Sequence, residues 1–255
     1  MSDLRAMQRL CGLMRKAVQD YEMLRPGDRV LVGVSGGKDS VALTMGLHLL
    51  REYIGFEYEI RAVTLDPQFG GEAADYSALE ELFGRAGIPY EIRRTDIGPV
   101  VFDYRQEKNP CALCAKLRRG ALHTAAQELG CNKVALGHHL DDAIETFYMN
   151  LWREGRIGCF SPVTYLSRRD LTLIRPMLLA TEAEVTAAIR EEGLPIVKSR
   201  CPADGATARE ETKEFVRERC RTDRAFRQKT LHALQESGID GWRPLHTGRG
   251  SFVIK

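Results

Sequence analysis

The stretch Val30-Leu31-Val32-Gly33-Val34-Ser35-Gly36-Gly37-Lys38-Asp39-Ser40 decides how this chain folds. Its first five residues form a short apolar run, which predicts a buried strand. The next glycines allow a sharp turn, and the residues from 41 onwards follow a helical pattern. The stretch therefore predicts a strand, a loop of the size of a phosphate group, and a helix whose positive end faces that loop.

The loop offers an oxyanion bare backbone N–H groups, one ammonium and two hydroxyls, supplied by Gly36, Gly37, Lys38, Ser35 and Ser40. Asp39 would be repelled by phosphate unless a cation intervenes, so we expect Mg²⁺ nearby. The loop is not the usual nucleotide P-loop, because Val32 stands where that motif has glycine and Asp39 stands where it has serine or threonine. We therefore expect this loop to bind phosphate in a different way from the P-loop.

The same alternation of apolar runs and helical patterns continues along the chain. We expect further strands at 58–65, 90–93, 133–136 and 171–177. We expect further helices at 74–86, 113–129, 141–152 and 182–192. Repeated strand–helix units of this length predict an α/β fold with a parallel sheet covered by helices on both faces.

Two further helices are expected outside this alternation. Residues 4–24 carry an apolar stripe at helical spacing that ends before Pro26-Gly27. Residues 212–234 have the pattern of one long charged helix. We therefore divide the chain into an N-terminal helix at 1–27, the α/β domain at 28–200 and a C-terminal segment at 201–255.

Three conspicuous segments fall at the carboxyl ends of predicted strands, where parallel sheets bind their ligands. They are Ser35–Ser40, Asp66-Pro67 and Gly137–Asp142. We expect Asp66 and Gly137 to contribute to one shared nucleotide site. Asp141 lies on one helical face with Glu145, and we expect it to hold Mg²⁺ or to cap the helix that this segment begins.

Cysteine spacing indicates a metal or cluster site. Cys111 and Cys114 are three residues apart, so a turn leading into a helix can aim both thiols at one metal or cluster. Cys201 is the best third candidate, and a zinc site would usually want a fourth ligand. The remaining cysteines have no partner at ligand spacing and are expected to be packing residues, namely Cys11, Cys131, Cys159 and Cys220.

Composition limits the class of protein. Hydrophobic residues make up 44% and charged residues 28% of 255, which is typical of globular proteins rather than disordered or membrane-spanning ones. No apolar run is long enough to cross a bilayer, and the N-terminus lacks the order of a secretion signal, so we expect a cytoplasmic protein that makes no membrane contact. The seven cysteines are an odd number, which is unlike a secreted disulfide framework.

Because the net charge is only +2, any basic surface for nucleic acid must be local. Lys116, Arg118 and Arg119 follow the cysteine pair and are placed to meet triphosphate or RNA backbone. A second group, Arg217, Arg221 and Arg224, is expected on one face of the charged helix and would track phosphates. An ordinary solvated surface remains the alternative for both groups.

The loop sequence Ser-Gly-Gly-Lys-Asp-Ser resembles the signature of the PP-loop ATP-pyrophosphatase superfamily. The chain is similar, more narrowly, to the TtcA family of tRNA two-thiocytidine synthetases. The segments that carry this resemblance are Ser35–Ser40, 111–120, Gly137–Asp142 with Glu145-Thr146, and Cys201.

The resemblance implies an adenine nucleotide α-hydrolase-like fold and a reaction in which ATP adenylates a pyrimidine carbonyl oxygen of tRNA before sulfur displaces AMP. It implies catalytic roles for Lys38, Asp39 and Asp141, and nucleotide contacts from the loop and from Asp66, Gly137, Lys116 and Arg119. It also implies a [4Fe–4S] cluster held by Cys111, Cys114 and Cys201.

The partners expected are tRNA and a sulfur donor of the cysteine-desulfurase type, with a homodimer as an option. One alternative keeps the adenylation but uses an amine nucleophile, as in lysidine synthesis, and the cysteine trio argues against it. The other alternative hypothesis is that the protein is a non-catalytic iron–sulfur sensor with a nucleotide-binding fold. The presence of Lys38, Asp39 and Asp141 argues against it.

Overall fold

A six-stranded sheet forms the centre of the protein, whose structure, a computed structural model, describes residues 5–105, 110–202 and 209–246. The strands are β1 (Arg29–Gly33), β2 (Glu59–Asp66), β3 (Tyr90–Arg94), β4 (Lys133–Ala135), β5 (Val163–Leu166) and β6 (Leu171–Ile174). Their order is β3-β2-β1-β4-β6-β5. The expected α/β fold with a parallel sheet is confirmed, and at one edge β5 adds to it by pairing antiparallel with β6.

The helices are α1 (Arg5–Asp20), α2 (Lys38–Leu50), α3 (Ser77–Arg85), α4 (Pro110–Glu128), α5 (Leu140–Arg153), α6 (Glu182–Glu191), α7 (Arg209–Thr222) and α8 (Phe226–Ser237). Short irregular turns of helix lie at Phe69–Gly71, Pro99–Tyr104 and Ile239–Gly241. No helix in these described ranges has the length and apolar character needed to span a bilayer.

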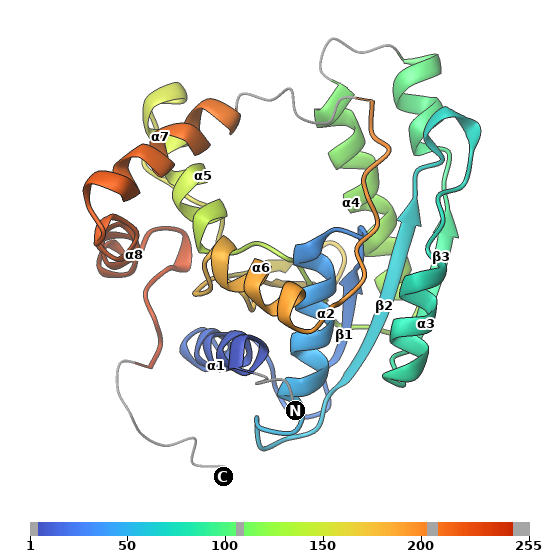
Figure 1. Cartoon of the computed structure of the whole chain (residues 1–255), viewed down its shortest axis with the longest axis horizontal. Helices are drawn as coiled ribbons and strands as arrows, with labels where there is room; N and C mark the ends of the chain where they lie inside the picture. The colour runs from blue at the N-terminus through green and yellow to red at the C-terminus, as the bar shows by residue number, and fades with distance from the viewer. Residues whose placement is uncertain (1–4, 106–109, 203–208, 247–255) are drawn as a thin grey trace.

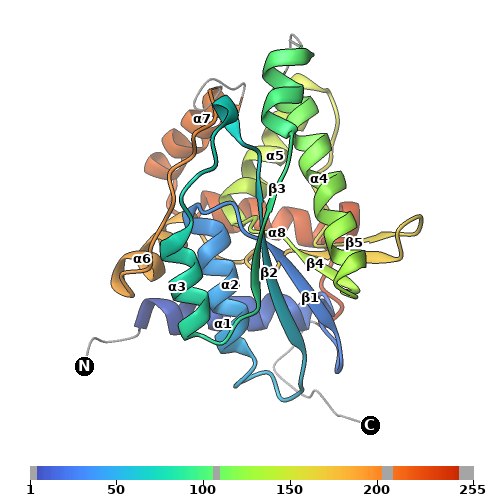
Figure 2. The same ribbon diagram turned by 90° about the vertical axis from the view of Figure 1, so that its right-hand side faces the viewer.

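Helices cover both faces of the sheet, as the sequence predicted. Side chains alternate along β1, so Val30 and Val32 join the core beneath α1, α2, α3 and α6, while Leu31 joins the core beneath α4. Figure 2 shows the first group of helices on one side of the sheet and α4 on the other. Both faces are apolar because each is buried against helices.

The leading helix α1 packs against α2 and α6 through its apolar stripe. Gly46 of α2 makes this approach possible, because a Cβ atom at this position would lie 2.5 Å from Sδ of Met14. Trp242, near the end of the described chain, is fully buried and meets Tyr21, the residue after α1, edge-on at 6.3 Å. The first helix and the last described residues are therefore packed together on this side of the core.

The expectation of one long charged helix at 212–234 is wrong, because the chain breaks into α7 and α8 around Asp223. The Asp223 carboxylate accepts a hydrogen bond from the backbone N–H of Ala225 at 2.9 Å, and its carbonyl accepts one from Phe226 at 3.0 Å. An aspartate that bonds nearby backbone in this way offers an alternative to helix. Both helices then pack against α5 (Figure 1). Arg224 lies in the turn, so it does not share a helical face with Arg217 and Arg221.

Candidate active site

The loop Ser35–Ser40 joins the carboxyl end of β1 to the start of α2, as the sequence predicted. Gly36 has a φ of +87°, and its carbonyl accepts a hydrogen bond from the N–H of Val197 at 2.9 Å. Ser40 braces the turn, since its Oγ accepts from the N–H of Ser35 at 3.2 Å and donates to the carbonyl of Gly37 at 2.9 Å. Gly37 caps α2 without a side-chain bond, which leaves the N–H groups of the first helical turn available to an anion.

Lys38 is held beside the loop by two carboxylates. Its Nζ lies 2.7 Å from Oδ1 of Asp39 and 3.3 Å from Oε1 of Glu182, the first residue of α6. Burial lowers the pKa of Lys38, but these two carboxylates outweigh it and the pKa lies above its ordinary value. Lys38 is therefore a fixed positive charge at the mouth of the loop.

Gly137 follows β4 and packs directly against the loop. A Cβ atom at Gly137 would lie 3.3 Å from the carbonyl carbon and oxygen of Asp39, so a larger residue would push the two segments apart. His139 is the N-cap of α5 and forms a reciprocal pair of hydrogen bonds with Asp142. Its Nε2 lies 3.9 Å from Oδ1 of Asp39. The structure thus brings Gly137 together with the loop, by backbone packing rather than by a side chain.

Asp141 is buried and joins three helices rather than facing the loop with a free carboxylate. Its Oδ2 accepts from the N–H of Glu182 at 2.7 Å, and its Oδ1 accepts from Nε of Arg227, on α8, at 2.6 Å. Asp141 does not cap its own helix, whose N-cap is His139; its carboxylate instead accepts from the first residue of α6. A carboxylate with both oxygens engaged in this way is poorly placed to bind Mg²⁺.

Asp66, at the end of β2, is also buried, and its carboxylate shapes the loop that follows. Oδ1 accepts from the N–H of Gln68 at 3.0 Å and Oδ2 accepts from the N–H of Ala74 at 3.1 Å. The structure therefore places Asp66 beside the nucleotide loop but uses its side chain to hold backbone.

The three cysteines singled out by spacing come together at the same end of the sheet. Cys111 and Cys114 lie in the first turns of α4, and the segment that follows α6 runs toward the start of that helix (Figure 1). Cys201 belongs to this segment by sequence. Arg200 anchors this segment by an ion pair with Glu72 at 2.8 Å.

Burial raises the pKa of the Cys114 thiol, the charge of Arg118 lowers it, and the charges of Cys201 and Cys111 raise it further. Cys111 and Cys201 therefore both lie near enough to Cys114 to interact with it electrostatically. No group of three His, Cys, Asp or Glu side chains within the described ranges is close enough to hold a single metal ion. Thiolates are the ligands that iron–sulfur clusters take, so the donor type of these three residues is compatible with a cluster.

Two cavities flank the loop and share Ser35 and Arg118. One, of about 430 Å³, lies toward α4 and is also lined by Arg119 and Arg175. The other, of about 240 Å³, lies toward the loop after β2. Because Arg118 lines both cavities and lowers the pKa of Cys114, it connects the nucleotide loop with the cysteines. Lys116 is exposed and lines neither cavity.

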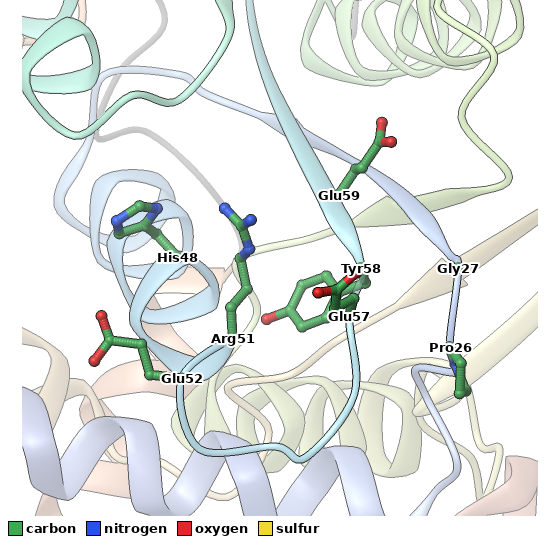
Figure 3. A pocket seen from close by; sticks show the side chains of 8 residues that line it. All are labelled: Pro26, Gly27, His48, Arg51, Glu52, Glu57, Tyr58 and Glu59. Atoms are coloured by element: carbon green, nitrogen blue, oxygen red, sulfur yellow. The ribbon is translucent and has the colours of Figure 1, made fainter.

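A larger cavity of about 760 Å³ lies at the opposite end of the sheet, beside the start of β2 (Figure 3). Its lining includes His48, Arg51 and Tyr58 and none of the motif residues. The largest of these cavities is therefore not the candidate active site. The loop, the Gly137 segment and the cysteines all lie at the carboxyl ends of the strands, and we place the site there.

Sequence reasoning missed two charged residues of this region. Glu182 contacts Lys38, and Arg175 is buried beside Phe160 with burial lowering its pKa to about 10. Arg175 directly follows β6. Its position as a charged residue at the carboxyl end of a predicted strand could have marked it as a site residue. Nothing in the sequence around Glu182 marks it, because its role depends on how α6 meets the loop.

Comparison with known proteins agrees with this geometry. Residues 8–221 match the PP-loop domain family, so the chain is a PP-loop protein of the ATP-binding class. The chain is 39% identical over 201 residues to the tRNA-cytidine(32) 2-sulfurtransferase of Syntrophotalea carbinolica, covering 78% of this chain and 77% of that protein. It is 37% identical to the enzyme of the same name from Pelobacter propionicus, covering 86% and 81%. The chain belongs to the tRNA-cytidine(32) 2-sulfurtransferase family.

Among solved structures, the U34-tRNA thiolase NcsA from Methanococcus maripaludis, determined with its [4Fe-4S] cluster, is similar in fold with a TM-score of 0.76. The two chains are 23% identical, and the match covers 91% of this chain and 78% of that one. At this identity the likeness supports the PP-loop fold alone.

Proposed function

We propose that this protein is an ATP-dependent tRNA sulfurtransferase that exchanges the 2-carbonyl oxygen of a cytidine for sulfur. Membership of a family whose relatives are named for cytidine 32 of tRNA supports the substrate. The observation that carries the proposal is that Cys111, Cys114 and Cys201 gather at the end of the sheet that carries the Ser35–Ser40 loop.

The chemistry has two displacements. The carbonyl oxygen attacks the α-phosphorus of ATP, the bond to the β-phosphate oxygen breaks, and pyrophosphate leaves. A sulfur nucleophile then adds to the activated carbon, the carbon–oxygen bond breaks, and AMP leaves with the original oxygen. Adenylation is needed because a carbonyl oxygen is a poor leaving group and an adenylate is a good one.

The loop residues would hold the pyrophosphate end of ATP. Lys38 supplies a fixed positive charge, and the first N–H groups of α2 supply donors that need no reorganisation when charge develops. We assign Asp39 as the carboxylate that meets Mg²⁺, because both oxygens of Asp141 are engaged by Glu182 and Arg227. Mg²⁺ would neutralise phosphate charge that otherwise repels Asp39.

In this proposal Asp141 and Asp66 position the nucleotide site indirectly, because their carboxylates bind the backbone N–H groups of Glu182 and Gln68. Gly137 contributes because its lack of a side chain lets its segment pack against the loop. Arg118 and Arg119 are the basic residues of α4 that line the cavities, so we assign them to the nucleotide or to the base being modified. Lys116 is exposed and stays a candidate for RNA backbone only.

The cysteine trio supplies the thiolate donors that a [4Fe–4S] cluster takes. Such a cluster, when bound, offers an open iron site that can carry sulfur. The protein's own contribution there is to bury Cys114, to place Arg118 against it, and to bring Cys201 back to α4 by anchoring Arg200 on Glu72.

The remaining expectations are part of the proposal. We propose a cytoplasmic enzyme that binds tRNA, takes sulfur from a cysteine-desulfurase-type donor and is able to form a homodimer. Arg217 and Arg221, four residues apart on α7, remain the proposed phosphate-tracking pair, with Arg224 in the turn beside them. The division at 1–27, 28–200 and 201–255 stays a prediction.

Mass spectrometry of tRNA nucleosides tests the function. Cells that lack this protein should lose 2-thiocytidine, and restoring the wild-type chain but not the Lys38→Ala variant should return it. The purified reaction should release AMP and pyrophosphate. Unchanged thiolated nucleosides in the deletion strain, or ADP and phosphate as the only nucleotide products, would contradict the proposal.

A further inference from the structure

The N-termini of three helices lie close together beside the nucleotide loop. Lys38 starts α2, Leu140 starts α5 and Glu182 starts α6. Two contacts hold these starts together: Lys38 meets the Glu182 carboxylate at 3.3 Å, and the Glu182 N–H donates to Asp141 of α5 at 2.7 Å. Helix N-termini carry positive partial charge, so their convergence favours an anion at this place.

A second lysine reaches the same place from the C-terminal segment. Nζ of Lys213, on α7, lies 3.4 Å from Oε1 of Glu182, the oxygen that Lys38 also contacts. The two ammonium groups are therefore within about 7 Å of each other, because both touch one atom. Two cations at this spacing can be bridged by adjacent phosphate groups of one polyphosphate.

The Glu182 side chain is not needed to cap its own helix. Thr181 and Glu184 form the capping box of α6, and Asp141 accepts the N–H of Glu182. The carboxylate of Glu182 instead holds the two lysines, and the lysine charges outweigh burial in lowering its pKa. An anion that competes for the two lysines can therefore displace the Glu182 carboxylate without uncapping α6.

We propose that Lys213 is a second ammonium ligand for the pyrophosphate end of ATP, and that Glu182 holds Lys38 and Lys213 together until the nucleotide displaces it. The inference rests on the proposed ATP binding by the Ser35–Ser40 loop. It makes the C-terminal helix α7 a part of the nucleotide site rather than an RNA-facing surface alone.

Lys213 is not required to dock α7. That helix packs on α5 through an apolar cluster in which Val216 is buried beside Leu140 and Ile144. Loss of Lys213 should therefore leave the fold intact, which thermal unfolding will check.

Calorimetric titration of the full-length chain with Mg²⁺ and inorganic pyrophosphate, and separately with AMP, tests the inference without tRNA. Lys213→Gln should bind pyrophosphate about ten-fold more weakly, while AMP binding stays unchanged because AMP lacks the pyrophosphate. Lys213→Arg keeps the charge and should stay within about three-fold of wild type. Lys229→Gln is the matched control, because Lys229 also sits in an ion pair of this segment, with Asp223 at 2.7 Å.

Glu182→Gln removes the competing anion and should bind pyrophosphate at least as tightly as wild type. Weaker binding in that variant would make Glu182 a ligand of Mg²⁺ and would overturn its assigned role. Wild-type affinity in Lys213→Gln, or equal losses for pyrophosphate and AMP, would overturn the role of Lys213. A wild-type chain that binds neither ATP nor pyrophosphate would contradict the proposed function itself, and this inference with it.

Discussion

Replacing Gly36 by alanine tests whether the nucleotide loop is held as tightly as the structure shows. The φ of +87° disfavours any side chain, at about 1–2 kcal/mol. The added Cβ would also lie 2.8 Å from Cβ of Val197 and 3.4 Å from its carbonyl oxygen, and overpacking of this kind costs about 1–3 kcal/mol. Gly36→Ala should therefore lower the free energy of unfolding by about 2–5 kcal/mol, which corresponds to a fall in Tm of about 4–20 °C for a chain of this length.

Gly55→Ala is the matched control, because Gly55 has the same φ of +87° and nothing within 4 Å of the position of its Cβ. It should show the backbone strain alone, about 1–2 kcal/mol. Urea and thermal unfolding followed by circular dichroism compare the two variants, and pyrophosphate binding should be lost only in Gly36→Ala. Equal destabilisation of the two variants would refute the close packing of the loop on Val197.

The other predictions concern the carboxylates and the cysteines. Asp141→Ala should lower the free energy of unfolding by about 2–4 kcal/mol, because it removes the acceptor of both Arg227 and the N–H of Glu182. The iron content should stay unchanged. A stability loss below about 1 kcal/mol would refute the bridging role. Glu182 has a folded-state pKa below its ordinary 4.5, so its contribution to stability is present above pH 4.5 and is lost as pH falls through the lower folded-state value. Acid unfolding of wild type and Glu182→Gln should therefore converge at low pH, and parallel curves would contradict this. Anaerobically prepared protein should be brown with about four irons per chain. Alanine at any one of the cysteine trio should abolish the iron, whereas Cys159→Ala should not, because burial raises the pKa of that thiol to about 12 and keeps it an inert packing residue. Stoichiometric zinc without iron would rule out the cluster.

Local sequence patterns predicted most of the helices and strands. Apolar runs and helical stripes predicted α1 to α6 and five of the strands to within a few residues, because each element buries one face or both and its sequence records that burial. The edge strand β5 escaped notice because its four residues are not fully buried, so they carry no apolar run. The break between α7 and α8 was missed because it rests on a side-chain bond of Asp223 within a charged stretch that otherwise reads as helix.

The candidate site divides in the same way. The sequence by itself determined the Ser35–Ser40 loop and the cysteine pair, because the glycines, lysine and closely spaced thiols have their chemical use within a few residues of one another. Only the tertiary structure decided that Asp141 ties α6 and α8 together, that Asp66 holds a loop, and that Glu182 and Lys213 meet Lys38. Those contacts join residues far apart in the chain, and their partners are fixed by how helices pack on the sheet. A carboxylate's role depends on which donors that packing brings to it, and no local pattern records them.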